Sequence, residues 1–253
     1  MNLETHNLTV AIHGKLLVED LNLTIPPGEL ICLLGTNGVG KTLTLHTLAG
    51  LLDASKGTVK IGGETLDALP RKEAARRIGL LLQIHEDAFP QTVTESALLG
   101  RYPHLGTWQW PDANDHELVN DALASFDLKD LGDRALTQLS GGERKRVALA
   151  TLKAQNPAIW LLDEPLNHLD PQHQLSVMRL LRDHARQGHG ILASLHNPGL
   201  ARRFADQALL LFGNGEWEFG PVDEILEPER MERLYNTPFE FFRHDDQVTL
   251  LPV

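Results

Sequence analysis

A glycine-rich segment that lies between an apolar run and a helix-like run could bind the phosphates of a nucleotide. Its spacing is G-x-x-x-x-G-K-[ST], and its residues are Gly35, Thr36, Asn37, Gly38, Val39, Gly40, Lys41 and Thr42. Glycines let backbone N–H groups surround phosphate oxygens, and the N-terminus of the following helix adds positive potential. In this pattern Lys41 reaches the β- and γ-phosphates and Thr42 ligates Mg²⁺. The alternative is a glycine-rich turn before a helix, but the flanking strand and helix favour nucleotide binding.

Two carboxylates follow a second apolar run, residues 158–162. In a phosphate-loop enzyme the first of them, here Asp163, holds Mg²⁺ directly or through water. The second, Glu164, could polarise the attacking water as a general base. An apolar strand that ends in Asp-Glu is common and, by itself, is more often structural than functional. Beside Lys41, however, the pair predicts a Mg²⁺ ligand and a catalytic base.

Ser140, Gly141 and Gly142 open a third stretch of interest, followed by the amphipathic residues 144–154. Ser140 as N-cap and Glu143 three residues later form a capping box, which would simply start a helix. Two glycines at a helix N-terminus also expose backbone N–H groups that can bind an anion. Both interpretations can hold together.

The pattern of apolar residues predicts the elements that position these residues. Alternation over 3–9 and 16–25 is typical of an antiparallel meander, and β–α alternation beyond residue 157 is typical of an α/β core. Segment 85–156 is mostly helical, with loops at 103–112 and 132–133. The expected strands are 30–34, 57–61, 78–83, 158–162, 191–195, 208–212 and 248–251. The expected helices are 41–51, 71–77, 171–187, 197–205 and a short one after Pro228.

These elements predict one domain over 1–253. Residues 1–84 and 157–227 form the α/β core with its β-subdomain. Residues 85–156 form an inserted helical subdomain, and 228–253 form a C-terminal extension of unknown role.

Composition limits the function classes. The chain has 253 residues, 42% of them hydrophobic, and a formal net charge of -11. An acidic surface argues against nucleic acid as the main partner. The single cysteine, Cys32, cannot form an internal disulfide, which favours the cytosol. Without a signal peptide or an apolar run of about 20 residues, the protein is not expected to cross a membrane itself.

Taken together, the motifs resemble those of the ATP-binding cassette (ABC) ATPases over essentially the whole chain, in the family's order. Segment 35–42 resembles Walker A, 159–164 resembles Walker B and 139–143 resembles the signature sequence. Three further positions match: Gln83 the Q-loop glutamine, Asp170 the D-loop and His196 the switch histidine. The resemblance implies a P-loop NTPase fold with a RecA-like core, an N-terminal antiparallel β-subdomain and an inserted helical subdomain.

The resemblance also implies how the site works. Two copies would pair head to tail, with ATP between Walker A of one and residues 140–142 of the other, and Asp170 at the seam. Glu164 would activate water and His196 would contact the γ-phosphate. Gln83 would contact Mg²⁺ and link it to a membrane partner. Taken singly, Gln83 and His196 have ordinary alternatives, a solvated strand end and a structural histidine.

Segment 99–104 and the pair His173-Gln174 resemble the importers of metal chelates, such as ferric siderophores, haem and cobalamin, and related molybdate systems. The alternative for 99–104 is a helix end broken by proline. The resemblance implies a polytopic permease dimer, a substrate-binding protein and a place on the cytoplasmic face of the inner membrane. Metal binding by this chain itself is rejected, because His168 and His173, or His184 and His189, are five residues apart rather than three or four.

Two rivals remain. One is a soluble cassette ATPase that does mechanical work on a complex without a permease, which purification from membranes would test. The other is a nucleotide-binding scaffold that does not hydrolyse ATP, which a phosphate-release assay would test. The acidic charge opposes the first, and an intact Glu164 and His196 oppose the second.

Two positions depart from the family's pattern. Leu166 stands where the family commonly has Thr or Ser, which leaves the detail of the D-loop open. Ile12 stands where the family usually has an aromatic residue that stacks on adenine.

The Ile12 departure gives a test. Stacking of a base on an aromatic ring contributes about 1–3 kcal/mol, so we predict weak ATP binding, or a base that packs on an aliphatic surface. The substitution Ile12→Tyr should therefore tighten ATP binding in a titration. An unchanged affinity would contradict the assignment of Ile12 to the base site.

Overall fold

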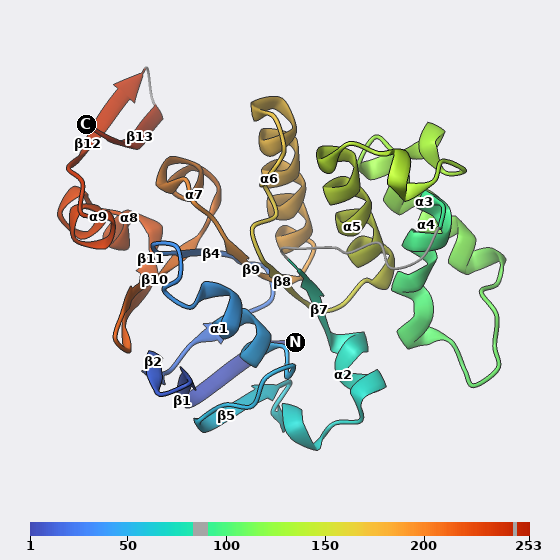
Figure 1. Ribbon diagram of the computed structural model, residues 1–253, viewed down its shortest axis with the longest axis horizontal. Helices are drawn as coiled ribbons and strands as arrows, with labels where there is room; N and C mark the ends of the chain where they lie inside the picture. Colours follow the sequence, from blue (N-terminus) through green and yellow to red (C-terminus); the bar gives the residue numbers. More distant parts are fainter. Residues whose placement is uncertain (83–90, 245–246) are drawn as a thin grey trace.

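The structure of the protein is a computed structural model that describes residues 1–82, 91–244 and 247–253. Its centre is a six-stranded sheet in the order β11-β10-β4-β9-β8-β7 (Figure 1). Neighbouring strands are parallel, except that β11 is antiparallel to β10. The strands are β4 (Leu30–Leu34), β7 (Ile78–Leu81), β8 (Ile159–Leu162), β9 (Gly190–Ser194), β10 (Gln207–Gly213) and β11 (Glu216–Pro221). Every residue of β4, β8 and β9 is buried, as expected for parallel strands covered on both faces.

An antiparallel sheet formed mainly by N-terminal residues packs below the first in the view of Figure 1. Its strand order is β2-β1-β5-β6, and β3 pairs with β1. The strands are β1 (Leu3–Ile12), β2 (Lys15–Leu21), β3 (Thr24–Ile25), β5 (Lys56–Ile61) and β6 (Glu64–Thr65). The α/β fold with an antiparallel N-terminal region, predicted from the apolar pattern, is confirmed.

Helices cover both faces of the central sheet and extend beyond its β7 edge. They are α1 (Lys41–Leu48), α2 (Arg71–Arg77), α3 (Val93–Leu98), α4 (Ala113–Ser125), α5 (Gly141–Gln155), α6 (Pro171–Arg186), α7 (Pro198–Phe204), α8 (Val222–Ile225) and α9 (Pro228–Tyr235). Short 3₁₀ helices are η1 (Leu66–Ala68), η2 (Leu99–His104), η3 (Lys129–Leu131) and η4 (Leu136–Gln138). Among the described residues, none of these helices is long and apolar enough to span a bilayer.

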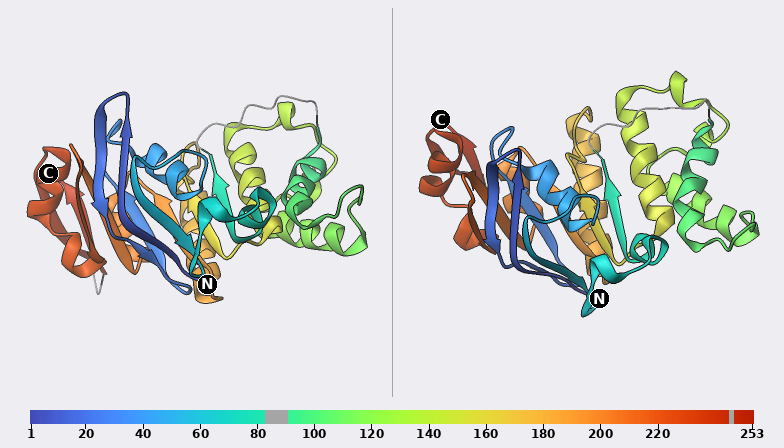
Figure 2. Two further views of the ribbon diagram at one scale, coloured as in Figure 1. Left: turned by 90° about the horizontal axis from the view of Figure 1, so that it is seen from below. Right: turned by 60° about the horizontal axis from the view of Figure 1, so that its bottom comes forward.

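Two apolar clusters hold the layers together. One lies between α1, the antiparallel strands and one face of the central sheet. The other lies on the face covered by α6 and α7 and continues into α3, α4 and α5, which stand together beyond β7 (Figures 1 and 2). Val119 on α4 and Trp160 on β8 belong to this same cluster. The apolar core thus runs across the predicted boundaries at residues 84, 156 and 227. The division of the chain into subdomains stays a prediction.

The ends of some elements differ from the sequence-based expectation. The helix expected over 41–51 ends at Leu48, because Gly50 adopts a positive φ of 69°. The strand β12 (Phe239–His244) was not predicted, and it pairs with β13 (Gln247–Pro252) in a C-terminal hairpin. Its sequence, Phe-Glu-Phe-Phe-Arg-His, places two aromatic residues in succession and so lacks a clean alternation.

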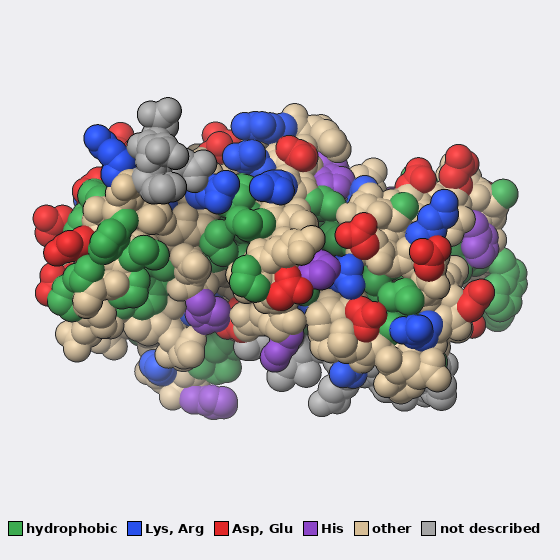
Figure 3. Space-filling view, turned by 90° about the horizontal axis from the view of Figure 1, so that it is seen from above, with side chains coloured by type: hydrophobic (Ala, Val, Ile, Leu, Met, Phe, Trp, Pro, Cys, Tyr) green, Lys and Arg blue, Asp and Glu red, His purple; other side chains and the backbone are tan. Residues whose placement is uncertain are grey.

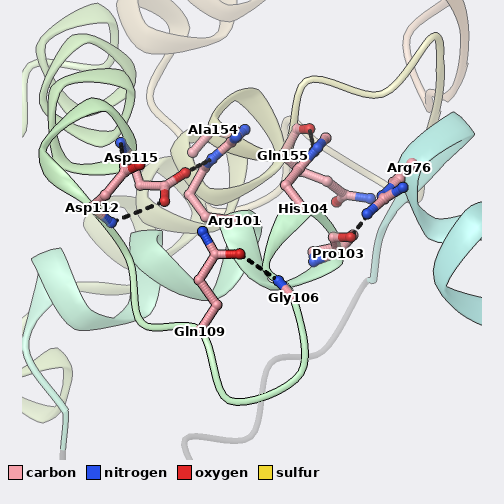
Figure 4. Close-up of polar contacts among 10 residues, drawn as sticks. All are labelled: Arg76, Arg101, Pro103, His104, Gly106, Gln109, Asp112, Asp115, Ala154 and Gln155. Atoms are coloured by element: carbon pink, nitrogen blue, oxygen red, sulfur yellow. Dashed lines mark hydrogen bonds and ion pairs between the residues drawn. The ribbon is translucent and has the colours of Figure 1, made fainter.

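Segment 99–104 has a structural role at the end of helix α5 (Figure 4). Arg101 is buried; its Nε lies 2.8 Å from Asp115 Oδ1, and its Nη1 donates to Ala154 O at 2.8 Å. His104 Nε2 lies 2.8 Å from Gln155 O. The last carbonyl groups of a helix lack partners within it, and cations there are favoured by the helix dipole. Arg101 and His104 thus bind the last carbonyl groups of α5. A helix end broken by Pro103 therefore explains only part of the sequence of segment 99–104.

His184 on α6 is buried against Trp160 of the central sheet. The His184 ring stacks on Trp160 with centroids 5.0 Å apart, and the His189 ring lies 5.6 Å from His184. The five-residue spacing does not separate these rings, because α6 ends at Arg186 and the chain turns back. Burial, with added effects of Lys153 and His189, lowers the pKa of His184 from 6.5 to about 4.

This buried His184 predicts acid sensitivity. In the unfolded chain His184 takes up a proton as the pH falls below 6.5, whereas the folded chain resists until about 4. Stability present above pH 6.5 is therefore lost as the pH falls towards 4, by about 3 kcal/mol at most. The substitution His184→Leu should remove much of the fall in melting temperature between pH 7 and 5, and His116→Leu, at an exposed position of α4, should not. Equal pH dependence in both variants would exclude His184 as the cause.

Candidate functional site

The phosphate loop lies between β4 and α1, and close packing fixes its start. A Cβ atom on Gly35 would lie 2.8 Å from Leu211 O and 2.9 Å from a Val39 methyl group, so only glycine fits there. The buried Lys41 Nζ donates hydrogen bonds to Gly35 O at 2.7 Å and Thr36 O at 3.1 Å. Burial lowers the pKa of Lys41, and the charges of Glu164 and Asp163 oppose this effect. The lysine thus lies close to both carboxylates.

The two predicted carboxylates follow β8 and are tied to the end of β9 by Ser194. The Ser194 hydroxyl donates to Asp163 Oδ1 at 2.9 Å and accepts a hydrogen bond from the backbone N–H of Glu164 at 2.8 Å. Asp163 is completely buried, and its Oδ2 has no hydrogen-bond partner among the described residues. A buried carboxylate oxygen without a partner fits a hard cation such as Mg²⁺, which prefers oxygen ligands.

Both oxygens of Glu164 accept hydrogen bonds from side chains. His196 Nε2 donates to Glu164 Oε1 at 2.8 Å, and Asn167 Nδ2 donates to Oε2. His196 follows β9, and Asn167 follows the Walker B strand by five positions. The backbone of Glu164 has a positive φ of 49°, which is uncommon for a residue other than glycine. These contacts aim one carboxylate into the space above the phosphate loop.

A cleft of about 460 Å³ brings these groups together. Its lining includes residues of the phosphate loop with its lysine and threonine, Glu164, and the two side chains that donate to the Glu164 carboxylate. The lining residues are Asn37, Gly38, Gly40, Lys41, Thr42, Leu43, Glu164, Asn167 and His196.

The second glycine pair lines a different cleft. Ser140 caps α5 and forms the predicted capping box with Glu143, in which each side chain accepts a hydrogen bond from the other residue's backbone N–H. The cleft around it is about 420 Å³ and shares no lining residue with the phosphate-loop cleft. Asp170 lies in it and caps α6 by accepting from His173 N at 2.9 Å. The chain therefore does not bring residues 140–142 to its own phosphate loop.

Gln83 lies outside the described residues. Ser194 and Asn167 were missed: Ser194 ends an apolar strand two residues before His196, which was a usable signal, whereas Asn167 gave none. Leu166 is buried in the larger apolar cluster, which explains an apolar side chain there. Ile12 is partly exposed at the end of β1, opposite Lys15, whose Nζ donates to Gly38 O at 3.3 Å.

The fold and the cleft together define a phosphate-loop ATPase, and comparison with known proteins gives its family. Residues 18–167 match the family model described as ABC transporter. The chain belongs to the ABC transporter family and is an ATP-binding, ATP-hydrolysing member of it.

Several relatives match nearly the whole chain. It is 35% identical over 250 residues to the hemin import ATP-binding protein HmuV of Pseudomonas aeruginosa, covering 97% of this chain and 96% of that protein. It is 37% identical to the protein of the same name from Nocardia farcinica, covering 91% of this chain and 80% of that one. Among solved structures, an inward-facing metal-chelate type ABC transporter matches with a TM-score of 0.87 and 27% identity, over 99% of this chain and 97% of that one.

The position of Ser194 leads to a prediction. The substitution Ser194→Ala leaves Asp163 Oδ1 and the N–H of Glu164 without a buried partner, which costs about 1–3 kcal/mol. We expect ATP hydrolysis to fall about tenfold, because displaced carboxylates lose their geometry, while ATP binding changes little. Ser176→Ala, which removes an exposed hydroxyl of α6, is the matched control. Full hydrolysis by Ser194→Ala would show that the hydroxyl does not position the carboxylates.

Proposed function

We propose that this chain is the ATPase subunit of an importer for a metal chelate, and that it acts on a membrane permease from the cytoplasmic face. The observation that supports this most is the cleft in which Lys41, Glu164 and His196 meet. The import of a chelate is supported by the relatives, whose names specify hemin import, and by the metal-chelate type transporter of similar structure. Hemin is therefore the first chelate to test.

The proposed roles follow from the geometry of the cleft. The backbone N–H groups of the loop and the Lys41 ammonium bind the β- and γ-phosphates. Thr42 and the unpartnered Asp163 Oδ2 would hold Mg²⁺, which would neutralise charge on the phosphates. Glu164 takes the proton from the attacking water, and its hydrogen bonds to His196 and Asn167 fix its direction. His196, beside it, contacts the γ-phosphate. The role of Gln83 at the Mg²⁺ ion is carried by the resemblance alone.

We also propose that the working unit is a homodimer. Residues 140–142 lie in a cleft separate from the phosphate loop, and their helix N-terminus suits an anion. A second copy that supplies its phosphate loop to this cleft would complete two equal sites. In this arrangement ATP joins the copies, and hydrolysis separates them.

The remaining partners in the proposal are a polytopic permease dimer and, indirectly, a substrate-binding protein. No role with nucleic acid is proposed. On the face shown in Figure 3, Lys and Arg side chains lie alongside Asp and Glu, and the chain carries a net charge of -11. Nucleic-acid binding usually needs a continuous basic surface.

The base assignment has a direct test. Glu164→Gln keeps the size of the side chain but cannot accept a proton, so we expect normal ATP binding, little turnover and accumulation of an ATP-bound dimer in size-exclusion chromatography. Lys41→Ala is the control, which should neither bind ATP well nor dimerise. Hydrolysis at the normal rate by Glu164→Gln would remove Glu164 from the role of base.

The transport role is tested separately. The chain is purified with its permease from membranes and reconstituted, and ATP hydrolysis is measured with hemin, a ferric siderophore or cobalamin and the matching binding protein. Stimulation by one chelate supports the proposal and names the cargo. Purification without a polytopic partner would favour the soluble ATPase that works on another complex.

A further inference from the structure

The C-terminal extension, residues 228–253, is firmly packed against the rest of the protein. It consists of α9 and the β12–β13 hairpin, which lie beside β10 and α7 at one end of the molecule (Figure 1). Met231, Leu234, Phe239 and Leu250 are buried and belong to the larger apolar cluster. The extension is therefore part of the folded core, and its contacts with the site have fixed geometry.

The first contact links α9 to the start of the phosphate loop. Tyr235, at the end of α9, has an Oη that solvent does not reach and that makes no hydrogen bond of ordinary geometry with the described residues. Burial raises the pKa of Tyr235 to about 12, and the neighbouring backbone amide of Gly35 opposes this rise. The neutral phenol oxygen thus lies beside the first glycine of the loop.

Strand β10 contacts both α9 and Gly35. Arg233, two residues before Tyr235, lies over the Phe212 ring at 4.2 Å from its centroid. Phe212 follows Leu211, whose carbonyl oxygen packs so closely on Gly35 that a Cβ would not fit. Gly35 is therefore confined by β10 and by Tyr235.

The second contact links β13 to the helix that follows His196. The Asn197 side chain starts α7 by accepting hydrogen bonds from the N–H groups of Gly199 at 2.9 Å and Leu200 at 3.2 Å. A Cβ atom on Gly199 would lie 2.7 Å from Thr249 Oγ1 and 3.3 Å from Leu250 O. The first turn of α7 thus rests directly on β13. Because His196 immediately precedes Asn197, a shift of this turn moves the imidazole.

We propose that the C-terminal extension fixes the phosphate loop relative to the His196 loop and so positions both for ATP binding and hydrolysis, with Tyr235 beside Gly35 and β13 packed closely on Gly199. The inference rests on the proposed function, because it requires Gly35 and His196 to lie at the bound triphosphate. The two loops follow neighbouring strands, β4 and β9, and the extension contacts both from outside the cleft. A displacement of about 1 Å in such a site can lower turnover by about a hundredfold.

The α7 contact has a steric test with a built-in rescue, carried out on the full chain. Gly199→Ala places a methyl group against Thr249 Oγ1, so we expect kcat to fall about tenfold with little change in the Kd for ATP. Thr249→Ala removes the opposing oxygen, so the double variant should recover most of the lost kcat, and Thr249→Ala alone should remain near the wild-type value. The proposal is overturned if Gly199→Ala turns over normally or if the double variant is no better than the single one.

The α9 contact should affect binding rather than turnover. Tyr235→Leu keeps an apolar side chain in the cluster and leaves the space beside Gly35 empty, so the start of the loop is less confined and we expect ATP binding to weaken about threefold with kcat nearly unchanged. Glu240→Ala, at an exposed position of β12, is the control and should change neither quantity. A purely structural role of Tyr235 predicts a changed melting temperature with normal Kd and kcat, and that result would overturn the assignment of Tyr235.

His196→Ala, measured in parallel, distinguishes a failure of the proposed function from a failure of the proposed role of the extension. Normal hydrolysis by His196→Ala would contradict the proposed role of His196 itself. An inactive His196→Ala together with a fully active Gly199→Ala would leave the proposed function in place and remove only the role of the extension.

Discussion

The site depends on the order of three neighbouring parallel strands, β4, β9 and β8. The phosphate loop follows β4, His196 follows β9, and the two carboxylates follow β8, so the parallel arrangement brings all of them to one edge of the sheet. Ser194 then joins the last two strands through one hydroxyl that contacts both Asp163 and the N–H of Glu164. Because β4, β8 and β9 are wholly buried, this register is fixed by the core, and the reacting groups have little freedom to drift.

Helix α5 starts in a cleft separate from that of the phosphate loop. Its N-terminus carries Ser140 and the two glycines, and its C-terminus is completed by Arg101 and His104. The buried Arg101 guanidinium also holds the pKa of Asp115 below its usual range, through the ion pair that joins η2 to α4. The helix is therefore anchored at its far end, and it can present residues 140–142 as a rigid surface to a second copy. In the proposed homodimer, a site divided in this way requires association before chemistry.

Much of the fold and part of the site could be predicted from the sequence. The strands β4, β8 and β9 are continuous apolar runs, and the phosphate loop has a spacing that demands particular residue types, so each could be read locally. The contacts of Ser194 and Asn167 with the carboxylates could not, because they depend on which strands become neighbours. The same limit explains β12, whose partner lies beyond it in the chain, and the meeting of His184 with His189, where a helix end changed the geometry expected from spacing.

The C-terminal extension lies far from the phosphate loop in the sequence but close to it in space. Residues 228–253 carry no motif, yet α9 reaches Gly35 and β13 supports the turn after His196. Both contacts are made to glycine residues, Gly35 and Gly199. Contacts of this kind cannot be recognised from the amino-acid sequence, because glycine has no side chain that indicates a partner. A glycine at 199 reads as a weak helix position until Thr249 is seen against it. Close packing on the backbone of these two loops is therefore the physical reason for the proposal that the extension positions the ATP site.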